Sequence, residues 1–195
     1  QAVEDMAIMR VIPNMIVLAP CDSIEAEKAT LASAKVKSPV YLRFAREKTP
    51  IFTTESTPFE IGKAEYFLKP EKADVVIIAC GPLVYNAILA AKDLGRNGIT
   101  VAVINNHTIK PMDEETIIDA AKKAGAIVTV EEHQIAGGMG SAVAEILAKN
   151  YPTPIEFVGV ENRFGESGTP DELIEAFGMG VEHIKEAVKK VVSRK

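Results

Sequence analysis

The chain has 195 residues, of which 47% are hydrophobic and 25% charged, which is the composition of a folded protein with a core. A chain of this length forms one large domain or two small ones. Its net charge of −5 argues against nucleic-acid binding, and its two cysteines are too few for a disulfide framework or a zinc site, so we expect a reducing cytoplasm.

The first piece of the chain, residues 1–46, has the pattern of a partial α/β domain. It begins with Gln1 and not with Met, from which we expect a missing segment upstream. The pattern predicts, in order, a helix at residues 2–10, a strand at 16–19, a helix from 23 to about 36 and a strand at 40–44. Asp22 and Glu25 have the spacing of a capping box. Two strands and two helices cannot bury both faces of a sheet, so we expect this piece to belong to a larger domain.

The remainder of the chain has the pattern of a more complete α/β domain that follows a linker. Residues 47–60 carry Pro50, Pro58 and several threonines without a helical or strand period, which predicts the linker. Strands are then predicted at residues 64–68, 75–79, 99–104, 126–130 and 155–160. Helices alternate with them, at residues 82–95, 113–125, 138–150, 169–178 and from about 181 onward. This alternation implies a mainly parallel sheet with helices on both faces.

The sequence predicts neither a membrane span nor a signal peptide. Its longest uncharged stretch, residues 75–91, is interrupted by Gly81 and Pro82, whereas a membrane helix needs about 20 uninterrupted apolar residues. The first ten residues already contain Glu4, Asp5 and Arg10, which a signal peptide would not.

Two acidic residues and a Gly-rich turn come directly after one predicted strand. Glu131, Glu132 and His133 follow the strand, and residues 137–140 then lead into a helix. Ligands gather at the carboxyl ends of strands in open α/β sheets, so these residues could perform acid–base chemistry or bind an anion. The turn departs from the GxGxxG spacing, however, and two acids would repel a phosphate. The alternative is a structural connection whose acids face solvent or an interface.

Two arginines, Arg43 and Arg46, flank the carboxyl end of the strand predicted at residues 40–44. A guanidinium at such a position suits bidentate binding of a phosphate. The alternative is a surface ion pair with Glu47 or another acid, and the sequence leaves both interpretations open.

The remaining polar residues and the two cysteines give weaker indications of a functional site. Residues 162–168 form a polar loop after the last strand, which could be a site but more often anchors a turn or a subunit contact. His107 and His183 have no second metal ligand at a useful spacing, which argues against zinc. Cys21 and Cys80 lie in apolar surroundings and are expected to be unreactive.

At these motifs the sequence resembles the C-terminal part of transketolases, in the form that is split into two chains. The matching segments follow in order along essentially the whole chain: residues 1–5, 11–17, 20–22, 43–47, 107–111, 130–140 and 163–168. The segments at 107–111 and 130–140 are shared more widely among thiamine-diphosphate enzymes, whereas Arg163-Phe164-Gly165-Glu166-Ser167-Gly168 looks particular to transketolases. Asn162 departs from the Asp that is common before Arg-Phe-Gly in the family.

The resemblance implies a fold and a reaction. The expected fold is α/β, with part of a pyrimidine-binding domain at residues 1–50, a linker at 51–60, and a transketolase C-terminal domain of three α/β/α layers at 61–195. Transketolases use thiamine diphosphate and a divalent metal (Mg) to move a two-carbon ketol unit from a ketose phosphate to an aldose phosphate, a reaction of the pentose phosphate pathway.

The resemblance also implies which residues act. Arg46 matches the arginine that binds the substrate phosphate, and Gln1 adjoins the family's active-site Thr-His pair and is expected to line the substrate channel. The family's catalytic Glu precedes the position of Gln1, and its metal and diphosphate ligands lie on another domain. We therefore expect no catalytic, cofactor-binding or metal-binding residue in this chain, and no activity from it alone.

The partners that the resemblance implies are an N-terminal transketolase subunit, a second copy of this chain in a homodimer, and a sugar-phosphate substrate, with no nucleic acid or membrane. Two alternatives stay open. The chain could belong to a related thiamine-diphosphate enzyme, either deoxyxylulose-phosphate synthase or the beta chain of a 2-oxoacid dehydrogenase, or it could be a non-catalytic dimerisation or regulatory module.

Overall fold

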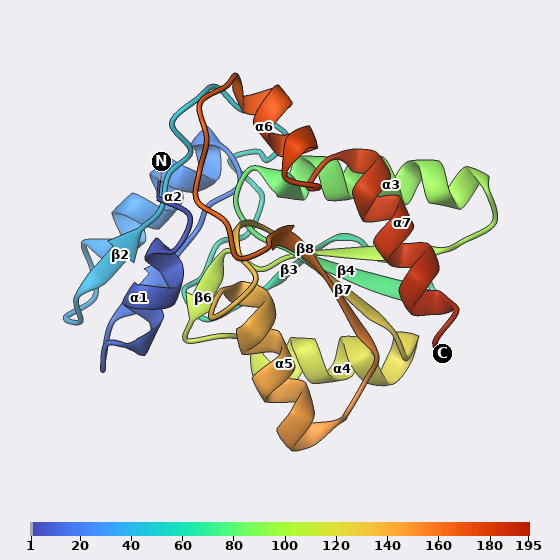
Figure 1. Cartoon of the computed structure of the whole chain (residues 1–195). Helices are drawn as coiled ribbons and strands as arrows, with labels where there is room; N and C mark the ends of the chain where they lie inside the picture. The colour runs from blue at the N-terminus through green and yellow to red at the C-terminus, as the bar shows by residue number, and fades with distance from the viewer. Residues whose placement is uncertain (1) are drawn as a thin grey trace.

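A computed structural model describes residues 2–195 and arranges them around two sheets, a small one of three strands and a larger one of five (Figure 1). The small sheet has the order β2-β1-β6 and the larger one the order β3-β5-β4-β7-β8. The small sheet lies with α1 and α2 on the side of the molecule away from the C-terminus (Figure 1).

The small sheet joins the two pieces of the chain. Its N-terminal elements are α1 (Asp5–Val11), β1 (Ile16–Leu18), α2 (Ser23–Ser33) and β2 (Val40–Leu42), close to the predicted elements. β1 pairs in parallel with β2 and antiparallel with β6 (Thr108–Lys110), which comes from the second piece. The sequence predicted a loop where β6 lies, because three residues are too few to show an alternating pattern.

The larger sheet has the predicted layers. It consists of β3 (Glu65–Leu68), β4 (Val75–Ala79), β5 (Val101–Asn105), β7 (Ile127–Gln134) and β8 (Ile155–Val160). Within this sheet, β3 pairs antiparallel with β5, and the other pairings described are parallel. The sheet is therefore mainly parallel, as expected. Every residue of β4 is buried, and alternate residues enter different cores, with Val75 and Ile77 in one and Val76 and Ile78 in the other.

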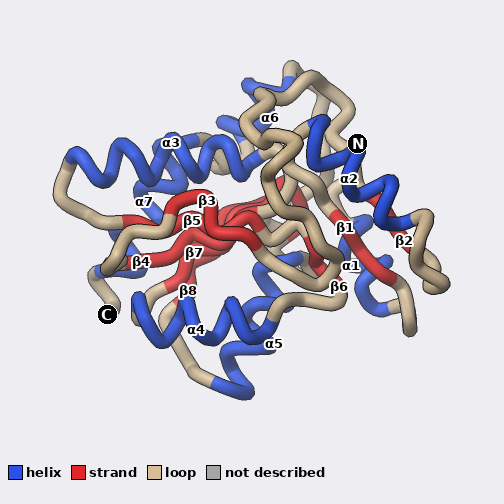
Figure 2. Tube along the Cα trace, turned by 180° about the vertical axis from the view of Figure 1, so that it is seen from behind, coloured by secondary structure: helices blue, strands red, loops and turns tan. Residues whose placement is uncertain are grey.

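Helices cover both faces of this sheet. α3 (Leu83–Arg96) and α7 (Val181–Val192) lie on one face, and α4 (Glu114–Ala124) and α5 (Met139–Asn150) on the other, as Figure 2 shows from behind. The short α6 (Pro170–Ala176) precedes α7 and begins with a capping box between Thr169 and Glu172. Asp113 caps α4, and Gly125 ends it in the left-handed region, as the sequence predicts. None of the helices within residues 2–195 has the length and apolar character to cross a bilayer.

A buried aspartate fastens the segment between the two pieces. The Asp22 carboxylate accepts the N–H of Glu25 at 3.0 Å and so caps α2, as predicted. The same carboxylate accepts the N–H groups of Phe52 and Thr53 and the Thr53 hydroxyl, at 2.7 to 2.9 Å. Glu25 does not complete the expected box, since its carboxylate accepts the N–H of Cys21 instead of that of Asp22. The segment at 50–58 is thus tied to the start of α2.

Candidate functional site

The structure separates the two arginines that follow β2. Arg43 is 12% exposed, and its Nε lies 3.1 Å from the Asp5 carboxylate on α1. Arg46 is 73% exposed, and the carboxylate recorded near it is that of Glu47, at 4.0 Å. Arg43 therefore takes the ion-pair role that the sequence left open, with a partner on α1. Arg46 keeps its guanidinium in solvent, where it can receive an anion.

Asp5 is the centre of a compact polar cluster at the end of β2. Its carboxylate accepts the Tyr41 hydroxyl at 2.7 Å as well as the Arg43 Nε. Burial favours the neutral form of Asp5, but the charge of Arg43 and the hydrogen bond from Tyr41 outweigh burial and lower its pKa. The ionised Asp5 neutralises Arg43, which could bind a phosphate only by leaving this partner.

Glu131 occupies the place where the Gly-rich turn could have held an anion. Its buried carboxylate accepts the N–H of Met139 at 2.7 Å and that of Gly140 at 2.8 Å, the first amides of α5. Burial raises the pKa of this carboxyl to about 8, although both hydrogen bonds favour its charged form. The expectation that the acids face solvent or an interface is wrong for Glu131. Because its oxygens accept the amides of Met139 and Gly140, these two amides are not available to a phosphate.

The two residues after Glu131 face the N-terminal piece. Burial raises the pKa of Glu132, while the positive charge of Arg43 acts in the opposite direction. His133 is fully buried, and its Nε2 accepts the N–H of Ala7 on α1 at 3.3 Å. β7 continues through these residues to Gln134, so they belong to the strand and do not follow it as the sequence predicted.

The structure gives the other two histidines and the two cysteines different surroundings. His107 is buried against the Phe59 ring, with 4.2 Å between ring centroids, and burial lowers its pKa to about 4. His183 lies 3.6 Å from a Glu175 carboxylate oxygen. Burial raises the pKa of both cysteine thiols, in agreement with the prediction that they are unreactive. Within the described part of the chain, residues 2–195, the acidic, histidine and cysteine side chains form no group suited to a metal ion.

The loop at residues 162–168 is ordered by its own contacts. Arg163 forms an ion pair with Glu166 and lies over the Phe177 ring, 4.3 Å from its centroid. The Gln134 side chain donates to the Arg163 carbonyl at 2.6 Å. Phe164 points into solvent and is 93% exposed.

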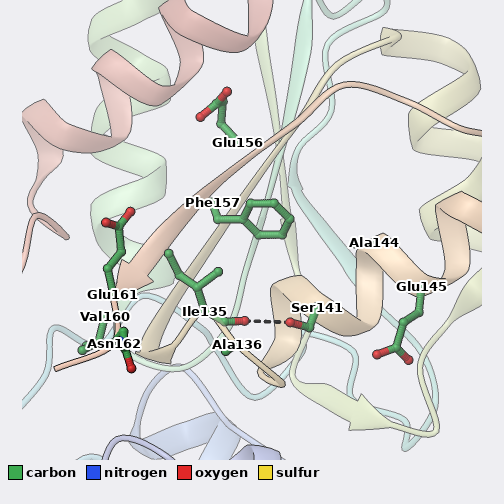
Figure 3. A pocket seen from close by; sticks show the side chains of 10 residues that line it. All are labelled: Ile135, Ala136, Ser141, Ala144, Glu145, Glu156, Phe157, Val160, Glu161 and Asn162. Atoms are coloured by element: carbon green, nitrogen blue, oxygen red, sulfur yellow. Dashed lines mark hydrogen bonds between the residues drawn. The ribbon is translucent and has the colours of Figure 1, made fainter. Parts of the chain in front are cut away.

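A groove of about 610 Å³ runs between α5 and the edge strand β8. Figure 3 shows Phe157, Ile135 and Ser141 around it, with three carboxylates at its margins. Two of these, Glu145 and Glu156, already have cationic partners on other elements. Neither arginine that follows β2 lines the groove, so it is separate from the candidate anion site.

The sequence predicts Arg46 as a candidate residue but does not predict the contacts of Asp5 and Tyr41, which hold the neighbouring Arg43. Asp5 and Tyr41 meet through the folding of the first piece, whereas His133 reaches α1 from the second piece. Gln1, the other predicted substrate residue, lies outside the described residues.

Two family models match the chain. The model "Transketolase, pyrimidine binding domain" matches residues 1–51, and the model "Transketolase, C-terminal domain" matches residues 62–184.

Two proteins and one solved structure are similar to this chain over 99–100% of its length. The chain is 42% identical over 194 residues to "6-deoxy-6-sulfo-D-fructose transketolase subunit SqwH" of Clostridium sp. (strain MSTE9), covering 100% of this chain and 60% of that protein. It is 40% identical over 197 residues to "Putative transketolase C-terminal section" of Methanocaldococcus jannaschii, covering 100% of this chain and 61% of that protein. The solved structure titled "Split gene transketolase, inactive beta4 tetramer" superposes with a TM-score of 0.95 at 40% identity, covering 99% of this chain and 63% of the other. The chain thus spans about three fifths of the length of these relatives.

Proposed function

The chain belongs to the transketolase family, and we propose that it acts as the C-terminal part of a split transketolase, which transfers a two-carbon ketol unit between sugar phosphates. The similarity to a transketolase subunit and to a C-terminal section over the whole chain supports this proposal. The role of the chain would be to supply part of the substrate site, while the chain alone would be inactive.

The observation that carries the proposal is the exposed guanidinium of Arg46. It follows the carboxyl end of β2, and its ion-pair partner among residues 2–195 is Glu47, at 4.0 Å. A guanidinium binds a phosphate through two parallel hydrogen bonds, and this geometry suits the phosphate end of a sugar phosphate. Arg43, which is held by Asp5, supports the base of the same segment. Gln1 is proposed to line the substrate channel.

The cofactor would be bound elsewhere. Transketolases depend on thiamine diphosphate, which supplies a stabilised carbanion when bound. The start of α5 does not suit its diphosphate, because Glu131 takes the amides of Met139 and Gly140. Nor do the described acids and histidines gather into a set that would hold Mg. We infer that these ligands come from an N-terminal partner subunit, in a cytoplasmic assembly built on a homodimer of this chain.

The substitution Arg46→Ala tests the proposal. In the polypeptide that carries this sequence, assembled with its N-terminal partner, it should raise the KM for sugar phosphates at least about tenfold, the loss of one charge-assisted contact, and leave the affinity for thiamine diphosphate unchanged. Lys48→Ala removes a neighbouring exposed cation and is the matched control. An unchanged KM in the Arg46 variant would refute the assignment.

Two other outcomes would point to the alternatives. Condensation of pyruvate with an aldose phosphate, without ketol transfer, would favour deoxyxylulose-phosphate synthase. Assembly with the partner without any thiamine-dependent activity would favour the non-catalytic module.

A further inference from the structure

Helix α1 depends on the second piece of the chain at both of its ends. It has seven residues, fewer than a helix needs to be stable by itself in water. The first and last turns of any helix leave backbone N–H and C=O groups without partners inside the helix. In α1 one such N–H and two such carbonyls, at Ala7, Arg10 and Ile12, are bonded by side chains that come from β7 and β6.

His133 caps the N-terminal end of α1. Its Nε2 accepts the N–H of Ala7 at 3.3 Å, while its Nδ1 donates to the Gln134 carbonyl at 2.8 Å. The carbonyl can only accept, which fixes the proton on Nδ1 and leaves Nε2 as an acceptor that faces α1. The residue at the helix's own capping position, Glu4, turns its carboxylate to the N–H of Val3 instead.

Lys110 caps the C-terminal end of α1. Its Nζ donates to the Arg10 carbonyl at 2.8 Å and to the Ile12 carbonyl at 2.7 Å. A lysine charge at this end also interacts favourably with the helix dipole. A second cross-link, the ion pair of Arg10 with Glu145 on α5, ties the same end of α1 to the larger domain.

The caps affect the candidate site because α1 carries Asp5. Asp5, in the first turn of α1, bonds Tyr41 and Arg43 at the end of β2, and Arg46 follows three residues later. We propose that His133 and Lys110 are positioning residues, which cap the two ends of α1 and so hold Asp5 against Arg43 and the segment that presents Arg46. The consequence for substrate binding rests on the proposed function; the capping of α1 does not.

The surroundings of His133 make its role testable by pH. The ring faces Glu131 on its own strand, with Nδ1 3.8 Å from a carboxylate oxygen, Asp5 on α1, and Arg43 after β2. Burial lowers the pKa of His133, so the ring is neutral at pH 7 and Nε2 can accept. Protonation in acid would place a proton on Nε2, which could then no longer accept the Ala7 N–H and would donate instead, for example to the backbone of Glu4 beside it.

Hydrogen exchange of the amides of residues 5–11 tests the capping in the chain itself. His133→Ala should speed exchange there about fivefold, the effect of one typical hydrogen bond. His133→Gln places a side-chain oxygen near the Nε2 position, so it should keep exchange within about twofold of the wild type and abolish its acceleration in acid. Lys110→Met should speed exchange at the C-terminal end of α1. Lys123→Met, which removes a lysine from an exposed ion pair on α4, is the control and should leave exchange in α1 unchanged. Unchanged exchange in His133→Ala, or equal acceleration in the Ala and Gln variants, would overturn the capping.

The kinetics of the assembled enzyme test the positioning. His133→Ala should raise the KM for the sugar phosphate at least about threefold with kcat within about twofold, and His133→Gln should restore the KM. If Arg46→Ala raises KM while His133→Ala speeds exchange but leaves KM unchanged, the positioning role is overturned. If Arg46→Ala itself has no effect, the proposed function fails, and the exchange measurement still decides whether His133 caps α1.

Discussion

The substitution Gly140→Ala sets helix propensity against close packing. Gly140 is the second residue of α5, where alanine is intrinsically favoured over glycine by about 1 kcal/mol. A Cβ at this position would lie 2.5 Å from the Thr129 Oγ1, 2.9 Å from a Phe157 ring carbon and 3.2 Å from a Glu131 carboxylate oxygen. Contacts this short force α5 away from β7 and lengthen the bond from the Gly140 N–H to Glu131.

The packing cost should exceed the gain in propensity. Overpacking a core position costs about 1–3 kcal/mol, and weakening a hydrogen bond to a buried carboxylate about 1–3 kcal/mol more. After the propensity gain of about 1 kcal/mol, Gly140→Ala should lower the free energy of unfolding by about 1–5 kcal/mol and the Tm by about 2–20 °C. Thermal and urea unfolding of the purified chain would measure both.

Gly95→Ala is the matched control, because it makes the same change in another helix. Gly95 lies in α3, and a Cβ there would have nothing within 4 Å. This variant should be more stable by about 0.5–1 kcal/mol. If Gly140→Ala were as stable as Gly95→Ala, the packing of Glu131 against the start of α5 would be refuted.

Two further predictions concern buried and half-buried carboxylates. Hydrogen bonds to Asp22 outweigh its burial and lower its pKa, so its stabilisation is present at neutral pH and is lost as the pH falls below the ordinary range of an aspartate. Asp22→Ala leaves the amides of Phe52 and Thr53 unpaired and should lower the free energy of unfolding by about 2–4 kcal/mol at pH 7 and by much less in strong acid. Urea titrations at the two pH values would measure this difference, and an equal loss at both would contradict the prediction. Glu156→Gln, which removes the carboxylate between Lys190 and Arg194, should cost about 1 kcal/mol, and the loss should shrink in 1 M salt; a cost independent of salt would argue against the ion pairs.

The larger sheet could be predicted because its signal is local. β4 is a continuous apolar run, and the structure begins and ends it where the pattern does, at Val75 and Ala79. A strand buried on both faces needs apolar residues at every position, so the sequence alone identifies it. β6 gave no such signal, because its three residues form a strand only when β1 from the other piece lies beside them.

The candidate site could be predicted only in part, for the same reason. The sequence places Arg43 and Arg46 together after one strand and cannot say which is free. Which arginine is exposed depends on Asp5, which α1 places next to Arg43. Asp5 forms an ion pair with Arg43, whereas the guanidinium of Arg46 stays in solvent. Lys110 is likewise predicted to lie in a loop, whereas in the structure it ends β6 and its side chain reaches the C-terminal end of α1.

Glu131 shows why the position of a motif in the fold is weak evidence for a ligand. The Gly-rich turn lies at the carboxyl end of a central strand and at the start of a helix, where anions often bind. The acceptor found there is part of the chain itself, since the Glu131 carboxyl accepts the amides of Met139 and Gly140. The glycine at 138 is needed for the same reason, because a Cβ there would lie 2.2 Å from a Glu131 oxygen. Glu131 and the glycines at 138 and 140, whose combination in the sequence argues against a phosphate site, therefore form one internal cap.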